Sequence, residues 1–414
     1  MPFDLLRRAH GRPRFAWLRE RTAWVGLGLR TAAVAEGEDR FQRLRWAARD
    51  LAARQGTAGP FFVGFGFTAK DHHPRPWWEN FPAALAALPE EVHGPLALPL
   101  PSLPTVTLLG TPSLPSPLAS PPRPQWEHTV SQALAAIAAG EFHKVVLARA
   151  EVLRFEAPLD PVTVLEALHR RHPTAFCFLF EPQPGVAFVG ATPERLARVT
   201  PTGQVETAAL AGTARRGGSP EEDTALGKAL LHSEKDRREH AWVVEAIREA
   251  LTPLAERLEI PAMPRLRRLP GLQHLETPIW GELRPAVGLL DVAAALHPTP
   301  ALGGVPREAA LRFIARHEPH PRGWYAAPVG IAFPDGTGEL AVAIRSALLL
   351  GDQAVVFAGA GIVAGSDPAR EWDETALKMT TMGEALAEAE RLTVGRQPSH
   401  LAPGTPHLTP EHTA

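Results

Sequence analysis

Cysteine is almost missing from this 414-residue sequence, in which Cys177 is the single example. One cysteine excludes a disulfide within the chain and is typical of proteins in a reducing compartment, so we expect a cytoplasmic protein. A surplus of charge of one sign is missing too, because 43 lysine and arginine residues face 45 aspartate and glutamate residues. This balance leaves no electrostatic footprint for nucleic acid, which we exclude as a partner.

Long apolar runs are also absent. No stretch approaches the roughly 18 uncharged apolar residues of a membrane-spanning helix, and the N-terminal segment lacks the apolar centre of a secretory signal. We therefore expect no membrane partner. The length suffices for two domains, or for one large two-layer domain with a substantial core.

Lysine and tyrosine are scarce, which makes each occurrence more informative. Lys144 and Lys378 are two of very few lysines among the basic residues, and Tyr325 is the single tyrosine. A buried lysine can lose its proton near neutral pH, whereas arginine cannot. A lysine in an arginine-rich sequence is therefore a candidate for acid–base chemistry.

Two acidic pairs lie on predicted helices far apart in the sequence. A helical pattern that starts near Pro220 carries Asp236 and Glu239, and a second helix carries Glu371 and Glu374. The members of each pair are three residues apart, so both carboxylates project from one face of their helix. Two such faces could hold a hard cation, and Mg²⁺ suits oxygen ligands best. Ordinary solvated helix faces are the alternative explanation.

A lysine at the start of a strand is the candidate base. The segment Phe142–Arg149 reads as a strand around its Val-Val-Leu core, and Lys144 is the charged residue at its beginning. The alternative is a lysine that protects an exposed edge strand.

A glutamate after a predicted strand is the candidate acid. The pattern predicts a helix over Pro161–Arg171, strands over Ala175–Phe180 and Val186–Gly190, and then a loop in which Glu194 follows Pro193. A carboxylic acid that is partly walled by apolar groups keeps its proton and can act as a general acid. The alternative is a surface glutamate.

Two further stretches could bind an anion. Gly212 and Thr213 end a run of small residues and offer backbone N–H groups and a hydroxyl. A strand over Leu340–Arg345 should pair with Gln353–Phe357 through a tight turn, which leaves Arg345 at its end to bind a carboxylate with two hydrogen bonds.

Composition divides the chain into three parts. Residues 1–125 form an N-terminal part that ends in a proline-rich connector, residues 126–394 carry the candidate catalytic motifs, and residues 395–414 form a polar, proline-rich tail that we expect to be disordered.

Taken in order, these motifs resemble the chorismate-utilising enzymes, which include the isochorismate, salicylate, anthranilate and aminodeoxychorismate synthases. The resemblance covers about residues 126–390 and is nearest to the isochorismate synthases of the menaquinone or siderophore type. It implies an α+β fold like that of anthranilate synthase component I, in which large antiparallel sheets pack as a sandwich with helices outside. It also implies chorismate as substrate and Mg²⁺ as cofactor.

The resemblance assigns a role to each motif. Glu239 and Glu374 resemble the direct Mg²⁺ ligands, and Asp236 and Glu371 the second carboxylate of each pair. Gly212 and Thr213 lie where the family binds the ring carboxylate of chorismate. The positions that match the rest of the substrate site are Tyr325, Arg345 and Gly359 for the enolpyruvyl carboxylate, and Lys378 near the metal helix.

The branch of the family follows from the chemistry that the resemblance implies. Isochorismate formation adds water at C2 and expels the C4 hydroxyl, so it needs a base and an acid on opposite sides of the ring. Lys144 matches the base and must be able to lose its proton. Glu194 matches the acid, and its pKa must rise.

Other positions separate this chain from the ammonia-using members. Anthranilate synthases typically carry glutamine where Lys144 stands, and aminodeoxychorismate synthases commonly carry a nucleophilic lysine where Ala211 stands. The pair Ala301 and Leu302 also resembles the isochorismate branch, whereas ammonia-using members have Gly-Thr. We therefore expect no glutaminase subunit.

Several alternatives stay open. Salicylate synthases keep the lysine and the glutamate and then eliminate pyruvate, and His274 matches a histidine associated with that step, although isochorismate synthases carry it too. The large subunit of an ammonia-using synthase and a non-enzymatic binding protein are further alternatives. We expect a monomer or homodimer, and a role in menaquinone synthesis rather than in siderophore synthesis.

Overall fold

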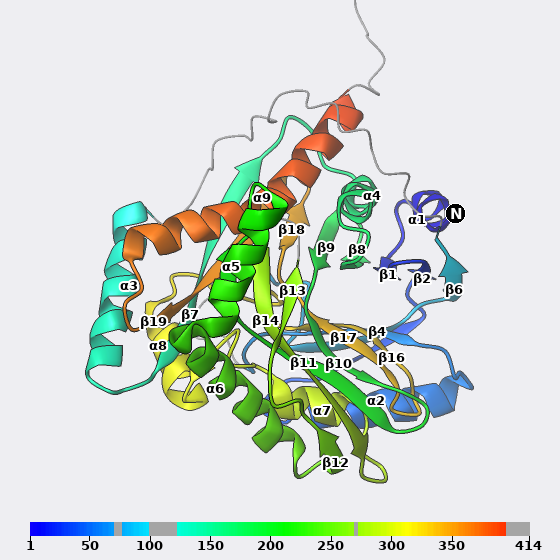
Figure 1. The fold of residues 1–414 in the computed structure, drawn as a ribbon. Coiled ribbons are helices and arrows are strands. Elements are labelled where there is room, and N and C mark those ends of the chain that lie inside the picture. The colour runs from blue at the N-terminus through cyan, green and yellow to red at the C-terminus, as the bar shows by residue number, and fades with distance from the viewer. Residues whose placement is uncertain (70–76, 99–121, 269–271, 395–414) are drawn as a thin grey trace, which may run out of the picture.

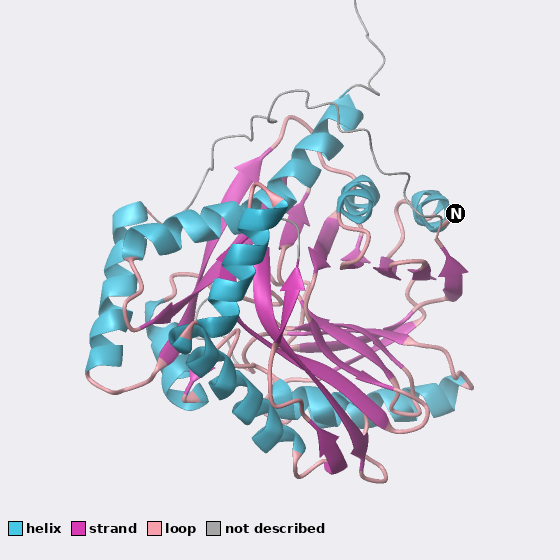
Figure 2. Ribbon diagram, viewed as in Figure 1, coloured by secondary structure: helices cyan, strands magenta, loops and turns pink. Residues whose placement is uncertain are grey.

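A computed structural model of the chain describes residues 1–69, 77–98, 122–268 and 272–394. The proline-rich connector and the tail predicted from the sequence lie largely or wholly outside these residues. Two layers of strands dominate the described part of the molecule, and helices cover their outer faces (Figure 1, Figure 2). Every strand pair in the two sheets is antiparallel.

The first sheet joins strands from both ends of the chain. Its order is β15 (Gly304–Val305), β7 (Lys144–Arg154), β19 (Gln353–Val363), β18 (Ser346–Leu350), β9 (Val186–Thr192), β8 (Phe176–Gln183), β1 (Arg14–Arg19), β2 (Thr22–Leu27) and β6 (Glu91–Ala97). The N-terminal strands therefore extend the sheet beyond β8.

The second sheet is assembled in the same way. Its order is β12 (Ala255–Glu259), β14 (Leu272–Leu283), β11 (Gln204–Arg215), β10 (Arg195–Val199), β17 (Gly338–Val342), β16 (Pro328–Ala332), β4 (Phe61–Phe65), β5 (Ala84–Leu88) and β3 (Thr31–Val34), and β13 (Arg265–Arg268) pairs with β14. Again the N-terminal strands complete one end.

Helices pack on both outer faces of the sandwich. The first sheet is covered by α1 (Pro2–Arg8), α4 (Pro161–Arg171) and α9 (Pro368–Val394), with α3 (Arg123–Ala138) packed beside α9. The second is covered by α2 (Arg40–Gln55), α6 (Glu234–Leu251) and α7 (Leu289–Leu296), which run along the lower side in Figure 1. Two more helices, α5 (Pro220–His232) and α8 (Arg307–His317), lie toward the sheet ends. Of the helices that the structure describes, none combines the length and apolar character needed to cross a membrane.

Strand β8 shows why the sequence is apolar on both sides of the first sheet. Successive side chains of a strand point to opposite faces. Phe176, Phe178 and Phe180 accordingly join the core between the sheets, whereas Cys177 and Leu179 belong to the core beneath the helices. A strand buried on both faces needs an uninterrupted apolar run, which is what this segment has.

The prediction of one long helix from Pro220 onward is wrong, because this segment forms two helices. Helix α5 ends at His232 and α6 begins at Glu234. Ser233 between them is extended, and its side chain accepts a hydrogen bond from the Asp236 backbone N–H at 3.2 Å. Serine competes for backbone hydrogen bonds in this way at helix starts. Asp236 therefore lies in the first turn of its own helix.

The strand pairing predicted for Arg345 is also wrong. Strand β17 ends at Val342 and belongs to the second sheet, whereas β18 pairs with β19 in the first. Arg345 lies in the connection that crosses from one sheet to the other, with a backbone φ of 52°. An extended strand cannot contain this left-handed conformation, which is uncommon for residues other than glycine.

Candidate active site

A cavity of about 280 Å³ lies where the two sheets meet helices α6 and α9. Its size is near the lower end of the roughly 300–1,000 Å³ of small-molecule sites. All the candidate residues predicted from the sequence line it. They are Lys144, Glu194, Gly212, Thr213, Asp236, Glu239, His274, Ala301, Leu302, Tyr325, Arg345, Gly359, Glu371, Glu374 and Lys378.

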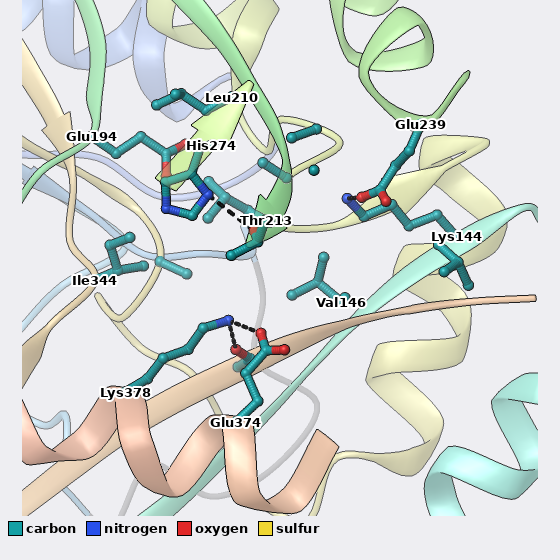
Figure 3. A pocket seen from close by; sticks show the side chains of 18 of the residues that line it. Lys144, Val146, Glu194, Leu210, Thr213, Glu239, His274, Ile344, Glu374 and Lys378 are labelled. Carbon is teal, nitrogen blue, oxygen red and sulfur yellow. Dashed lines mark hydrogen bonds and ion pairs between the residues drawn. The ribbon is translucent and has the colours of Figure 1, made fainter. Parts of the chain in front are cut away.

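Lys144 enters the cavity from one side. It is 5% exposed, and its Nζ donates to Glu239 Oε1 of α6 at 2.6 Å (Figure 3). The alternative of a protective edge-strand lysine is wrong, because Lys144 pairs with Val305 of β15 on one side and with Val363 of β19 on the other. The chain therefore places a buried amine against one of the candidate metal ligands.

Glu194 enters from the other side of the cavity, next to His274 (Figure 3). It lies in the connection from β9 to β10, which crosses from the first sheet to the second. Burial raises the pKa of the Glu194 carboxyl to about 7, although the charges of Arg267 and Arg345 oppose the rise. A group with this pKa is largely protonated just below neutrality, as a general acid must be. The surface-glutamate alternative does not hold.

A β-bulge shapes the anion-binding run. The register between β11 and β14 shifts between Ala211 and Thr213, and Gly212 at the shift has a φ of 74°. Glycine adopts this conformation without strain. Thr213 Oγ1 lies 3.0 Å from Nδ1 of His274. Burial lowers the pKa of His274 to about 4, so its ring is neutral at neutral pH and can either donate or accept this hydrogen bond.

Tyr325, Arg345 and Gly359 form another wall. Burial raises the pKa of Tyr325 to about 12, so the phenol keeps its proton and can donate a hydrogen bond. A Cβ at Gly359 would lie 3.0 Å from the Leu147 carbonyl oxygen and 3.3 Å from the Tyr325 hydroxyl, so a side chain there would crowd this wall. Burial lowers the pKa of Arg345, but a guanidinium keeps its charge at neutral pH. This wall offers a hydroxyl and a cation to an anionic ligand.

The acidic pairs face the same cavity from α6 and α9. Lys378 Nζ donates to Glu374 Oε1 at 2.5 Å and to the Gly359 carbonyl at 2.9 Å. Burial lowers the pKa of Lys378, against the charge of Glu374. Burial and, second, the charge of Glu374 raise the pKa of Glu371. The negative charge here is thus only partly compensated.

The carboxylate oxygens of this site suit a divalent cation, but they do not form a preassembled metal site. Within the described residues, no three histidine, cysteine or acidic side chains are close enough to one another to hold a metal ion as they stand. Lys144 and Lys378 each hold one of the carboxylates instead. Carboxylate oxygens are nevertheless the ligands that Mg²⁺ prefers. Burial and, second, the charge of Glu374 disfavour the ionised form of Glu371, and a bound cation would offset both effects.

The cavity wall also contains two arginines, Arg267 and Arg322, that no sequence motif predicts. Arg322 is buried, pairs with Glu318 and donates to the backbone carbonyls of Leu302 at 2.9 Å and Val146 at 2.7 Å. Arg267 of β13 reaches the loop that carries Glu194. Apart from the Glu318–Arg322 pair, which is four residues apart, these contacts join residues distant in sequence, so no local spacing pattern predicts them.

Between the two sheets of the antiparallel sandwich lies a polar cavity whose walls carry arginine, lysine and carboxylate side chains. The chain belongs to the family of chorismate binding enzymes, whose family model matches residues 111–387. It is 50% identical over 265 residues to the salicylate biosynthesis isochorismate synthase of Pseudomonas aeruginosa, a match that covers 64% of this chain. The family prediction is therefore confirmed.

Solved structures confirm the predicted fold. The menaquinone-specific isochorismate synthase MenF from Escherichia coli matches with a TM-score of 0.74 and 28% identity, over 91% of this chain and 89% of that one. Anthranilate synthase component I from Streptococcus pneumoniae shares the fold with a TM-score of 0.69 at 22% identity, over 88% of this chain and 92% of that one. The chain spans about half the length of the first curated relatives it matches, 55% of the Pseudomonas protein.

Proposed function

We propose that this protein is an isochorismate synthase, an isomerase that converts chorismate into isochorismate. The observation that carries the proposal is the placement of Lys144 and Glu194 on opposite sides of one cavity. The names of its relatives support it, because both the Pseudomonas protein and MenF are isochorismate synthases. MenF is named for menaquinone, which supports a role in that pathway, and we propose a cytoplasmic location from the single cysteine.

The reaction divides between the two sides of the cavity. Lys144 takes a proton from a water molecule whose oxygen bonds to C2 of the ring. The double bonds shift, the C4–oxygen bond breaks, and Glu194 gives its proton to the departing hydroxyl, which leaves as water. One water enters and one leaves, so the product is an isomer. Because the nucleophile is water and not ammonia, no glutaminase partner is proposed.

The remaining walls hold the two carboxylates of the substrate. Arg345 and Tyr325 would bind the enolpyruvyl carboxylate through a charge-assisted hydrogen bond and a neutral one. Gly212 and Thr213 would bind the ring carboxylate. Mg²⁺ would be held by Glu239 and Glu374 with the second carboxylate of each helix, Asp236 and Glu371, and when bound it would supply positive charge to the ring carboxylate.

Product identity tests the proposal directly. The purified protein, incubated with chorismate and Mg²⁺, is expected to yield isochorismate as the sole new compound on a chromatogram. Excess EDTA should stop the reaction, and added Mg²⁺ should restore it, if the acidic pairs hold the metal. Salicylate with pyruvate would instead indicate a salicylate synthase, and anthranilate formed with an ammonium salt would indicate an ammonia-using synthase. Mg²⁺-dependent binding without turnover would indicate a binding protein.

Titration of Glu194 tests the proposed acid independently of turnover. The carboxyl stretch of Glu194 can be isolated in the infrared as the difference between the natural protein and Glu194→Gln. We expect protonated carboxyl at pH 6, with loss of the band as the pH rises through about 7, because burial disfavours the charged form. A carboxylate already fully ionised at pH 6 would contradict the assignment of Glu194 as the acid.

A further inference from the structure

Arg267 connects a strand of the second sheet to the loop that carries the proposed acid. Its Nη2 donates to the carbonyl oxygen of Pro193 at 2.8 Å, and its Nη1 donates to Glu276 Oε1 at 2.9 Å. Pro193 directly precedes Glu194, so the guanidinium binds the peptide unit from which the acid projects. Arg267 also lines the cavity itself.

The loop around Glu194 needs such an anchor because it crosses between the sheets. Strand β9 ends at Thr192 in the first sheet, and β10 starts at Arg195 in the second. The Glu194 N–H donates to Thr192 Oγ1 at 3.2 Å, and the Glu194 carbonyl accepts from the Val342 N–H at 3.0 Å. The hydrogen bond from Arg267 to Pro193 is the third that fixes this short connection, and of the three it is the one made by a charged side chain.

We propose that Arg267 is a positioning residue for the acid of this site, which it fixes by clamping the Pro193 carbonyl to Glu276. The inference rests on the proposed function and adds to it a residue that does not touch the reacting atoms. Glu276 is itself buried and also accepts from Nε of Arg265 at 2.8 Å. The carboxylate to which Arg267 is anchored is therefore itself held in place.

The charges around Glu194 support this role. The cations that favour its ionised form come from several elements, and Arg267 has the largest effect among them, followed by Arg345, Lys144 and Lys378. Tyr325 also faces Glu194 and keeps its proton. Arg267 thus both orients the carboxyl and limits how far burial raises its pKa.

Three substitutions separate positioning from general structural support. Arg267→Met removes both hydrogen bonds and the charge, yet leaves Glu276 with Arg265 as a partner. Arg267→Lys keeps the charge but cannot make the two-armed contact. Arg265→Met is the matched control, because Arg265 shares Glu276 with Arg267 but its hydrogen bond goes to that carboxylate and not to Pro193.

Steady-state kinetics with chorismate and the infrared titration of Glu194 supply the readouts. For Arg267→Met we expect kcat to fall about 10-fold to 100-fold, part of what a general acid contributes, with KM changed far less. The midpoint of the Glu194 titration should move to higher pH. Arg267→Lys should keep the midpoint near its natural value with a partial loss of kcat, and Arg265→Met should change neither.

Two results would overturn the proposal. One is an Arg267→Met protein whose kcat and Glu194 midpoint both match the natural protein. The other is an equal loss in Arg267→Met and Arg265→Met, which would assign the effect to Glu276 alone. If the natural protein formed no isochorismate, the proposed function would fail, while the infrared titration would still report whether Arg267 acts on Glu194.

Discussion

Replacement of Lys144 by alanine should abolish isochorismate formation while the protein continues to bind chorismate. A positioned general base contributes about 100-fold to 10,000-fold in rate, and Lys144 is the amine that the structure places against Glu239. Binding should persist, because Arg345, Tyr325 and the Gly212–Thr213 run do not depend on this amine. Product formation gives the rate, and calorimetric titration with chorismate in the presence of Mg²⁺ gives the affinity.

Lys228→Ala is the matched control for this experiment. Lys228 is an exposed lysine of α5, away from the residues that line the cavity, so the same substitution there should leave turnover unchanged. Near-normal turnover in Lys144→Ala would show that the base is a different group. Loss of chorismate affinity in parallel with loss of rate would show that Lys144 binds the substrate instead.

Replacement of Glu194 by glutamine should cause the second large loss. The carboxamide keeps the shape of the side chain but cannot deliver a proton to the departing hydroxyl. We expect kcat to fall by about 100-fold to 10,000-fold with little change in chorismate affinity. Glu308→Gln, at an exposed position of α8, is the matched control and should be active.

The double variant tests whether the two residues act in one turnover. If Lys144 and Glu194 serve opposite sides of the same reaction, removal of both should cost little more than the worse single substitution, because effects of groups that act as a unit are not additive. Multiplicative losses would point to two independent roles. Full activity in Glu194→Gln would exclude it as the acid.

Elements with strong local signals could be predicted from the sequence. The predicted helix over Pro161–Arg171 is confirmed residue for residue, because Asp160 caps its first turn by accepting from the N–H groups of Val162 and Thr163. The break at Ser233 and the sheet crossing at Arg345 were missed. At Ser233 the reason is local, because the serine caps the start of α6. At Arg345 the reason is tertiary, because the chain crosses there from one sheet to the other.

The site was predictable as a set of residues but not as a network. Short sequence motifs contain Lys144, Glu194 and the acidic pairs, and the structure brings these residues into one cavity. The contacts of Arg267 and Arg322 join residues that are 74 and 176 positions apart, in the bonds to Pro193 and Val146. No periodicity links positions so distant, so only the fold could reveal them.

The N-terminal strands have a consequence for how the protein can be divided. Residues 111–387, which the family model matches, include neither β1, β2 and β6 nor β3, β4 and β5. Without these strands, β8 and β16 would become edge strands with unpaired backbone N–H and C=O groups. Trp324, next to Tyr325 of the cavity wall, would also lose its packing against Gly64 and Phe81. The catalytic motifs therefore do not form a transplantable module: grafting or expressing them alone would give a chain prone to aggregate rather than a minimal enzyme.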